Sequence, residues 1–216
     1  MPYPLLEIND LINTRKLKRA RNKLYNYKRS ERDDSWYLLK CKVEYYSSHY
    51  TAAIQALEAI NNSIGQEKTF WLAKNFYRKA LAVKDSHEKI DYFTKAISHY
   101  KILPNIKYHE RCELANCYFQ LFQLQPHHLK NDYKSNLSLL LSSVDFKGRA
   151  SFLFIKHADC ELYYGNNSLA LHLLMKVKDW WISFGVLKRL ESYRSSFLRG
   201  VDPGARKTAW FSWTVL

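Results

Sequence analysis

Histidine and cysteine, the residue types that most often bind zinc, come close together at one place in the chain. His109 is followed by Cys112 after three positions and by Cys117 after five more. On a helix, His109 and Cys112 lie one turn apart, but Cys117 falls about 140° around the axis from Cys112. Ligands spread in this way do not surround one ion, so we predict no metal site.

A second pairing of cysteine and histidine lies in the segment HADCE, where His157 precedes Cys160 by three residues. This combination supplies a nucleophile and a base, but nothing in the sequence orients it, and the nucleophilic alternative stays open. Asp33 and Asp34 are adjacent carboxylates, which are more typical of a helix start than of an acid–base couple.

Longer motifs of catalysis and nucleotide binding are absent from the sequence. No G-x-S-x-G, H-E-x-x-H or Walker pattern occurs, and the six glycines lie too far apart for a phosphate-binding loop. We therefore predict a protein that is not an enzyme, with no catalytic residue and no cofactor.

The composition points to an all-α protein of the cell interior. Only 6 glycines and 5 prolines occur in 216 residues, too few for the turns of a many-stranded sandwich or barrel. The four cysteines lack the spacing of disulfide or zinc modules and are expected to be reduced and buried. No apolar run approaches the roughly 18 residues of a membrane helix, and the first residues do not look like a secretory signal. We predict an intracellular protein, cytoplasmic or nuclear, without a membrane partner.

A helical stripe of apolar residues with a small first member recurs along the chain. The three clear copies are Ala20–Leu24–Tyr27, Ala53–Leu57–Ile60 and Ala170–Leu174–Val177. Two weaker copies have Lys89 or Leu137 in place of the small residue. The first members of successive stripes are 33 residues apart from 20 to 53 and 36 residues apart from 53 to 89. Because a second helical pattern precedes each stripe, we predict five helix pairs near residues 3–29, 34–61, 67–101, 107–144 and 149–177, and a final helix over 179–199.

Several residues between these patterns are typical of helix ends. Gly65 and Gly165 suit left-handed C-caps, and Asp85 with Glu88 resembles a capping box. Asn105, which follows Pro104, is a candidate N-cap. His127 and His128 are expected in a loop between helices. A helical bundle without repeats remains the alternative architecture, although it gives no reason for the recurring interval.

The order of large and small residues resembles the tetratricopeptide repeat (TPR) family. The best matches are Trp36, Leu39 and Val43 with the stripe from Ala53, and Tyr164-Gly165-Asn166 leading to the stripe from Ala170. The resemblance implies a right-handed α-solenoid of about five TPR-like helix pairs plus a C-terminal helix. This predicts one solenoid domain over residues 1–200, followed by a linker and aromatic tail over 201–216.

In the TPR family, the first helices of the pairs line a concave groove that holds a peptide or helix of a partner. Carried over to this chain, the resemblance implies solvent-facing groove positions on three predicted helices. They are Tyr37, Cys41, Glu44 and Tyr45; Phe70, Lys74, Tyr77 and Arg78; and His109, Asn116, Phe119 and Gln120. Tyrosines with a Lys/Arg pair suit an acidic or aromatic peptide. The alternative is that these aromatic residues only pack between repeats.

Positive charge is concentrated near the N-terminus. The chain carries a net charge of +14, and residues 1–32 hold nine Lys or Arg against three acidic residues. A helix starting near Thr14 would place Arg15, Arg19 and Lys23 on one face, with Lys16 beside them. This basic patch could bind phosphates, act as a nuclear-localisation signal, or form the solvated cap of the solenoid.

The chain ends in the apolar segment AWFSWTVL. It docks in a groove, anchors a partner, or is read-through beyond a cloning junction after Gly200. The terminal helices are also candidates for self-association. The predicted function is a TPR-like adaptor or scaffold within an intracellular complex. The alternative is a nucleic-acid-associated module, an RNA-binding repeat or part of a transcription regulator, that uses the basic patch.

Overall fold

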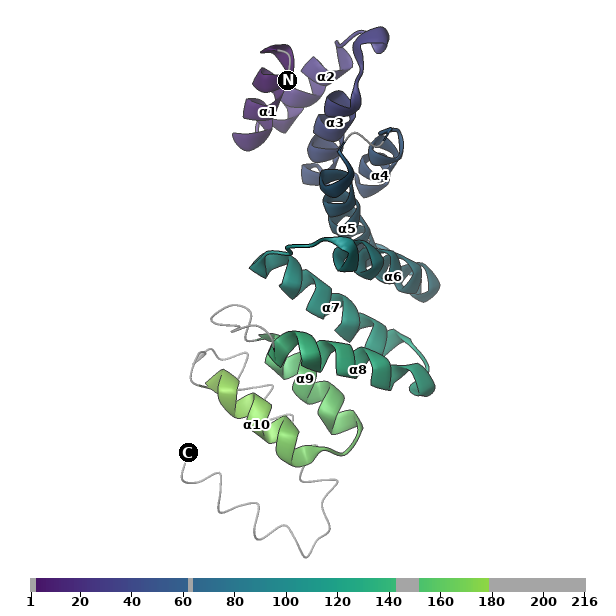
Figure 1. Ribbon diagram of the computed structural model, residues 1–216, viewed down its shortest axis with the longest axis vertical. Coiled ribbons are helices and arrows are strands. Elements are labelled where there is room, and N and C mark those ends of the chain that lie inside the picture. Colours follow the sequence, from purple (N-terminus) through teal and green to yellow (C-terminus); the bar gives the residue numbers. More distant parts are fainter. Residues whose placement is uncertain (1–2, 62–63, 143–151, 179–216) are drawn as a thin grey trace, which may run out of the picture. The chain divides into compact units, whose positions relative to one another are not determined.

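The computed structural model describes residues 3–61, 64–142 and 152–178, and in these residues α-helices are joined by short turns and loops, without a strand (Figure 1). The all-α prediction is therefore confirmed. The helices are α1 (Tyr3–Asn13), α2 (Leu17–Tyr25), α3 (Asp34–Tyr46), α4 (Tyr50–Glu58), α5 (Gly65–Ala82), α6 (Ser86–Ile102), α7 (Tyr108–Leu124), α8 (His127–Ser142), α9 (Phe152–Tyr163) and α10 (Asn167–Lys178), with a short 3-10 turn at Arg29–Glu31.

Each of the five predicted ranges contains two helices. The chain divides into two compact units, Met1–Tyr133 and Lys134–Leu216. In the first unit, every helix from α1 to α6 packs against the next one, and α1 also contacts α3, as α3 contacts α5. In the second unit α9 packs against α10. The predicted helix over 179–199 and the tail over 201–216 lie outside the described residues.

Three of the helix pairs share one turn. The second residue after the first helix takes a left-handed conformation, with φ of 59° at Arg15, 64° at Ser48 and 77° at Gly165. The next amide N–H then donates to the carbonyl five residues back. These bonds join Lys16 to Leu11, His49 to Glu44 and Asn166 to Glu161, at 2.8, 2.8 and 2.9 Å. The same turn therefore precedes each of the three clear stripes, which begin at Ala20, Ala53 and Ala170.

The small residue of each clear stripe has a structural reason. Ala20, Ala53 and Ala170 each follow this turn by the same number of residues, donate to the carbonyl four residues back, and are fully buried. A larger side chain at such a position would have to displace its close-packed neighbours. Leu137 does not occupy the equivalent place, because α8 begins at His127 and Leu137 therefore lies well inside the helix. The register assigned to the fourth stripe is wrong.

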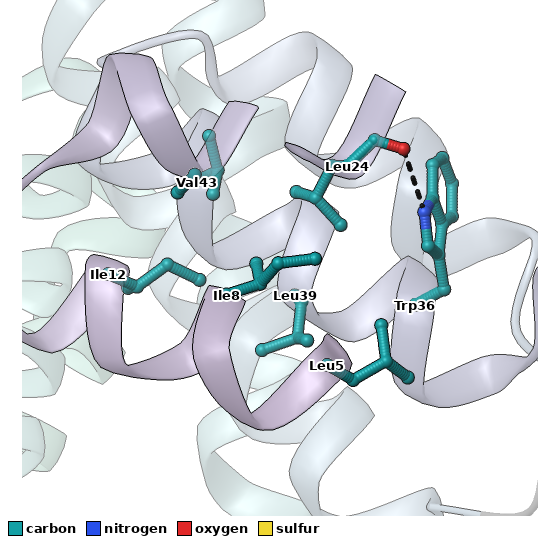
Figure 2. Close-up of a cluster of buried hydrophobic side chains, with 8 residues drawn as sticks. Leu5, Ile8, Ile12, Leu24, Trp36, Leu39 and Val43 are labelled. Atoms are coloured by element: carbon teal, nitrogen blue, oxygen red, sulfur yellow. Dashed lines mark hydrogen bonds between the residues drawn. The ribbon is translucent and has the colours of Figure 1, made fainter. Parts of the chain in front are cut away.

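The first three helices enclose an apolar cluster, which Figure 2 shows in close-up. Its members are Leu5, Ile8, Ile12, Ala20, Leu24, Trp36, Leu39 and Val43. Trp36 is 1% exposed, and its indole Nε1–H donates to the Leu24 carbonyl over 3.1 Å. The bond gives the buried indole N–H an acceptor and joins the end of α2 to α3.

The helix ends confirm some predicted caps and correct others. Asp33 accepts from the Trp36 amide and Asp85 from the Glu88 amide, both at 2.8 Å, so both carboxylates are N-caps. Gly165 has the predicted positive φ, whereas Gly65 is the first residue of α5. Gly65 is not a C-cap because α4 already ends at Glu58.

Two further predictions about where helices begin are wrong. Lys107, not Asn105, is the N-cap residue of α7. His127 and His128 form the start of α8 instead of a loop, since only Gln125 and Pro126 separate α7 from α8.

Candidate interaction surface on α3, α5 and α7

Polar side chains connect the first helices of the second, third and fourth pairs. We call this group the polar cluster, and it consists of Tyr45 on α3, Lys74, Tyr77 and Arg78 on α5, Tyr100 on α6, and Glu110, Glu113 and Asn116 on α7. All of its members belong to the first unit.

The charges of the polar cluster balance one another. Lys74 Nζ lies 3.6 Å from a carboxylate oxygen of Glu110 and 3.6 Å from one of Glu113. The Arg78 guanidinium lies 3.7 Å from the other oxygen of Glu113. Two cations on α5 therefore face two carboxylates on α7. The carboxylates and Lys74 are largely buried, while the Arg78 side chain is 45% exposed.

Hydroxyl and amide groups extend the polar cluster on both sides. Arg78 Nε donates to the Tyr45 hydroxyl over 3.3 Å, and Asn116 Nδ2 donates to the Tyr77 hydroxyl over 2.9 Å. The Tyr100 hydroxyl donates to Glu113 over 2.5 Å. Burial raises the pKa of Tyr77 to about 12 and also raises the pKa of Tyr45 and Tyr100, with the Glu113 charge adding to the effect at Tyr100. These hydroxyls stay protonated and can donate at neutral pH.

The polar cluster contains five of the residues predicted for the groove, namely Tyr45, Lys74, Tyr77, Arg78 and Asn116. Gln120 lies half-buried one turn beyond Asn116. Tyr37 is half-buried and belongs to the apolar packing instead, with its ring edge-on to Trp36 at 5.0 Å.

Several residues that were predicted to face solvent in the groove are buried instead. Tyr77 and Asn116 are buried, and so are Cys41, Glu44 and Phe119. They are covered because other helices pack against α3, α5 and α7, and the period of a single helix does not show where those neighbours lie. Lys74, Tyr45 and Phe70 are half-buried, whereas Arg78 and His109 are exposed.

Sequence reasoning missed Glu110, Glu113 and Tyr100. A signal for the two acids was present, because they follow Lys74 and Arg78 by 36 and 35 residues. Opposite charges one repeat interval apart, on equivalent faces of two helices, are expected to meet when repeats stack side by side. No comparable spacing pointed to Tyr100, which reaches Glu113 from the second helix of its pair.

Glu44 forms a separate contact between helix pairs. Its buried carboxylate accepts from the Arg21 guanidinium on α2 at 2.9 Å and lies 2.8 Å from the Nδ1 atom of His49. In the second unit, Glu161 has the equivalent place before the shared turn and accepts from Lys134 on α8 and from Asn166. Burial alone would raise the pKa of Glu161, but these hydrogen bonds bring it below its usual value.

The cysteines and histidines do not form a metal site among the described residues. Burial raises the pKa of Cys41 to about 12 and that of Cys112 to about 11, so neither is an activated nucleophile. Nε2 of His157 lies 3.1 Å from the Glu161 carboxylate, and Cys160 is fully buried. This arrangement is a buried contact within α9 and offers a substrate no access to the thiol.

The basic patch is arranged differently from the predicted helical face. Because α2 begins at Leu17 and not at Thr14, Arg15 lies in the preceding turn and does not share a helix face with Arg19 and Lys23. Lys23 forms an ion pair with Glu7 on α1. All four residues of the patch are exposed.

Comparisons with known proteins give no relative for this chain: no family model, no curated protein and no solved structure matches it. The resemblance to TPR proteins therefore rests on the residues themselves. In the part of the chain that the structure describes, no helix combines the length and the apolar character needed to cross a lipid bilayer.

Proposed function

We propose that this chain is a non-enzymatic, TPR-like adaptor, a right-handed α-solenoid that binds a peptide or helix of a partner protein over α3, α5 and α7. The supporting observation is the position of Arg78. Its side chain is nearly half exposed, yet it contacts Tyr45 on the preceding first helix and Glu113 on the following one. Side chains thereby link three successive first helices, which is the arrangement expected where neighbouring repeats stack.

The polar cluster is suited to binding because its donors and acceptors are already held in place. Side chains fixed by neighbours lose little conformational freedom when a ligand arrives, and that reduces the cost of association. Arg and Tyr are also the residue types that contribute most to binding energy at interfaces. Arg78 and Tyr45 are thus the residues that we expect to contact the partner directly.

The ion pairs within the polar cluster limit which chemical class of peptide can bind there. Lys74 and Arg78 already face Glu110 and Glu113, so an acidic peptide would have to compete with carboxylates that are held close by. The exposed face of Arg78 can instead stack on an aromatic side chain of a partner, as its guanidinium already lies 5.6 Å from the ring centre of Tyr77, and such a contact displaces no carboxylate. We propose an aromatic, hydrogen-bonding peptide in preference to a strongly acidic one.

A phage-displayed library of random dodecapeptides, selected on the immobilised full chain, tests this function. Enriched peptides are synthesised, and their affinity is measured for the wild-type protein, for Arg78→Ala and for the control Lys101→Ala, an exposed cation on α6. We expect Arg78→Ala to weaken binding at least tenfold and the control to change it less than twofold. Peptides without a common pattern, or equal binding by both variants, would refute the proposal.

A further inference from the structure

Four cations lie in the turn that follows α1 and in the first turn of α2. We call Arg15, Lys16, Lys18 and Arg19 the basic turn, and all four side chains are exposed. Within the described chain none of them forms an ion pair.

The neighbouring cations of the same segment differ in this respect. Arg21 pairs with Glu44, Lys23 with Glu7, and Lys28 lies 4.0 Å from Glu31. Among the described residues 3–28, the cations without an ion pair are therefore the four of the basic turn. The positive charge of the basic turn is thus a local feature of the structure and not only part of the net charge of the chain.

The position of the basic turn is also unfavourable for the stability of α2, because cations stabilise the C-terminal end of a helix and not its N-terminal end. Lys18 and Arg19 lie in the first turn of α2, which contains no acidic residue, and Lys16 at the N-cap position makes no capping bond with its side chain. The first amides of a helix have no acceptor within it and carry partial positive charge, so cations placed there are repelled. Folding alone favours Asp, Ser or Glu at these positions. Side chains and backbone together produce a positive potential that an anion would relieve.

Arg15 adds a cation that is held in place. Its guanidinium lies 4.0 Å from the ring centre of Tyr46, at the end of α3. Tyr46 is 36% exposed. Because Arg15 already covers this ring, the aromatic side chain beside the basic turn is occupied and does not offer a bare platform for stacking a base.

We propose that the basic turn binds the phosphodiester backbone of a nucleic-acid duplex. A duplex carries one negative charge for about every 1.7 Å of its axis, so four cations within five residues can meet several phosphates at once. Contacts of this kind position the duplex and do not read its sequence. Lys16, Lys18 and Arg19 lie at the start of α2 and contact no residue of the polar cluster, so substituting them leaves the proposed peptide surface intact and each proposal can fail alone.

Fluorescence anisotropy with a labelled 24-base-pair DNA duplex of mixed sequence tests the inference on the full chain. About four neutralised phosphates predict a slope near −3.6 for log affinity against log salt, which is about a hundredfold loss between 50 and 200 mM. The same sequence as a single strand and a poly-glutamate of similar charge form the comparison arms. Weaker binding of both is expected.

The variant Lys16→Gln/Lys18→Gln/Arg19→Gln should lower duplex affinity at least thirtyfold at 50 mM salt and reduce the slope by two to three units. The control Lys28→Gln/Lys84→Gln/Lys107→Gln loses the same charge elsewhere and should change affinity less than threefold. Far-UV circular dichroism and a urea midpoint check folding, which the first variant should not impair, since it removes cations from a helix start. Equal losses in both variants, equal or tighter binding of the single strand or of poly-glutamate, or no binding at 50 mM salt would overturn the assignment.

Discussion

Arg21 of α2 donates a 2.9 Å hydrogen bond to the buried carboxylate of Glu44 on α3 and thereby ties the first helix pair to the second. Glu161 repeats this relationship in the second unit, where Lys134 on α8 donates to it over 3.3 Å. Each acid stands at the same place before the shared turn, and in each case the cation comes from the helix that precedes the pair. An ion pair of this kind fixes the register between consecutive pairs, which apolar contacts alone specify less sharply.

Replacing Arg21 with Met should destabilise the protein by about 1–3 kcal/mol, because the Glu44 carboxylate would remain buried with one partner fewer. Urea unfolding at pH 7, followed by circular dichroism, measures the change. The matched control is Lys28→Met, which removes an exposed cation 4.0 Å from Glu31 and should leave the midpoint unchanged. Equal shifts in both variants would show that Arg21 has no special role.

The two described glycines should respond to substitution in different ways. Gly165→Ala places a Cβ at a φ of +77° and should cost about 1 kcal/mol, although no atom lies within 4 Å of the new Cβ. Gly65→Ala, also without a close neighbour, lies in the first turn of α5 at an ordinary φ and should leave stability unchanged or raise it. Thermal unfolding of the two variants side by side provides the measurement. A loss at Gly65 as large as that at Gly165 would contradict the left-handed requirement.

Stability should fall as the pH rises above about 10. Burial raises the pKa of Tyr77 and Tyr118 to about 12 in the folded state, while an unfolded tyrosine titrates near 10. The unfolded chain then loses protons that the folded chain keeps, so the free energy of unfolding decreases from about pH 10 to about pH 12 and is unaffected below. Urea midpoints between pH 8 and 11.5, with tyrosinate absorbance as a second signal, test this. Tyr118→Phe should make the decline less steep, whereas Tyr25→Phe, at an exposed position, should not.

The cysteines should react slowly in the folded protein. Cys41, Cys117 and Cys160 are buried, and Cys112 is half-buried with a pKa of about 11, so at pH 8 about one thousandth of it is thiolate. Iodoacetamide labelling followed by mass spectrometry should modify Cys112 first and the other three only after urea is added. Rapid labelling of Cys160 in the absence of urea would contradict its burial and would support the hypothesis of a nucleophilic cysteine in the segment HADCE.

Local periodicity could be predicted from the sequence because it depends on neighbours along the chain. The stripes that begin at Ala20, Ala53 and Ala170 located three second helices, and Asp33 and Asp85 marked two helix starts. The stripe assigned to Leu137 failed because most leucines of α8 lie near its C-terminal end, so their pattern does not show where the helix begins. Arg15 was misplaced for a related reason, since the left-handed turn that excludes it from α2 has no glycine to signal it.

The sequence by itself determined that the chain is helical, where most of its helices lie and which small residues they bury, since an α-helix repeats every 3.6 residues whatever surrounds it. Only the tertiary structure decided that Glu110 and Glu113 neutralise Lys74 and Arg78, that Glu44 is buried beside Arg21, and that the basic turn has no such partner among the residues that the structure describes. Pairs of this kind join separate helices, and whether two charges meet depends on the offset and rotation of one helix against another. That offset is set by the packing of whole helix faces, which no single stretch of the chain contains.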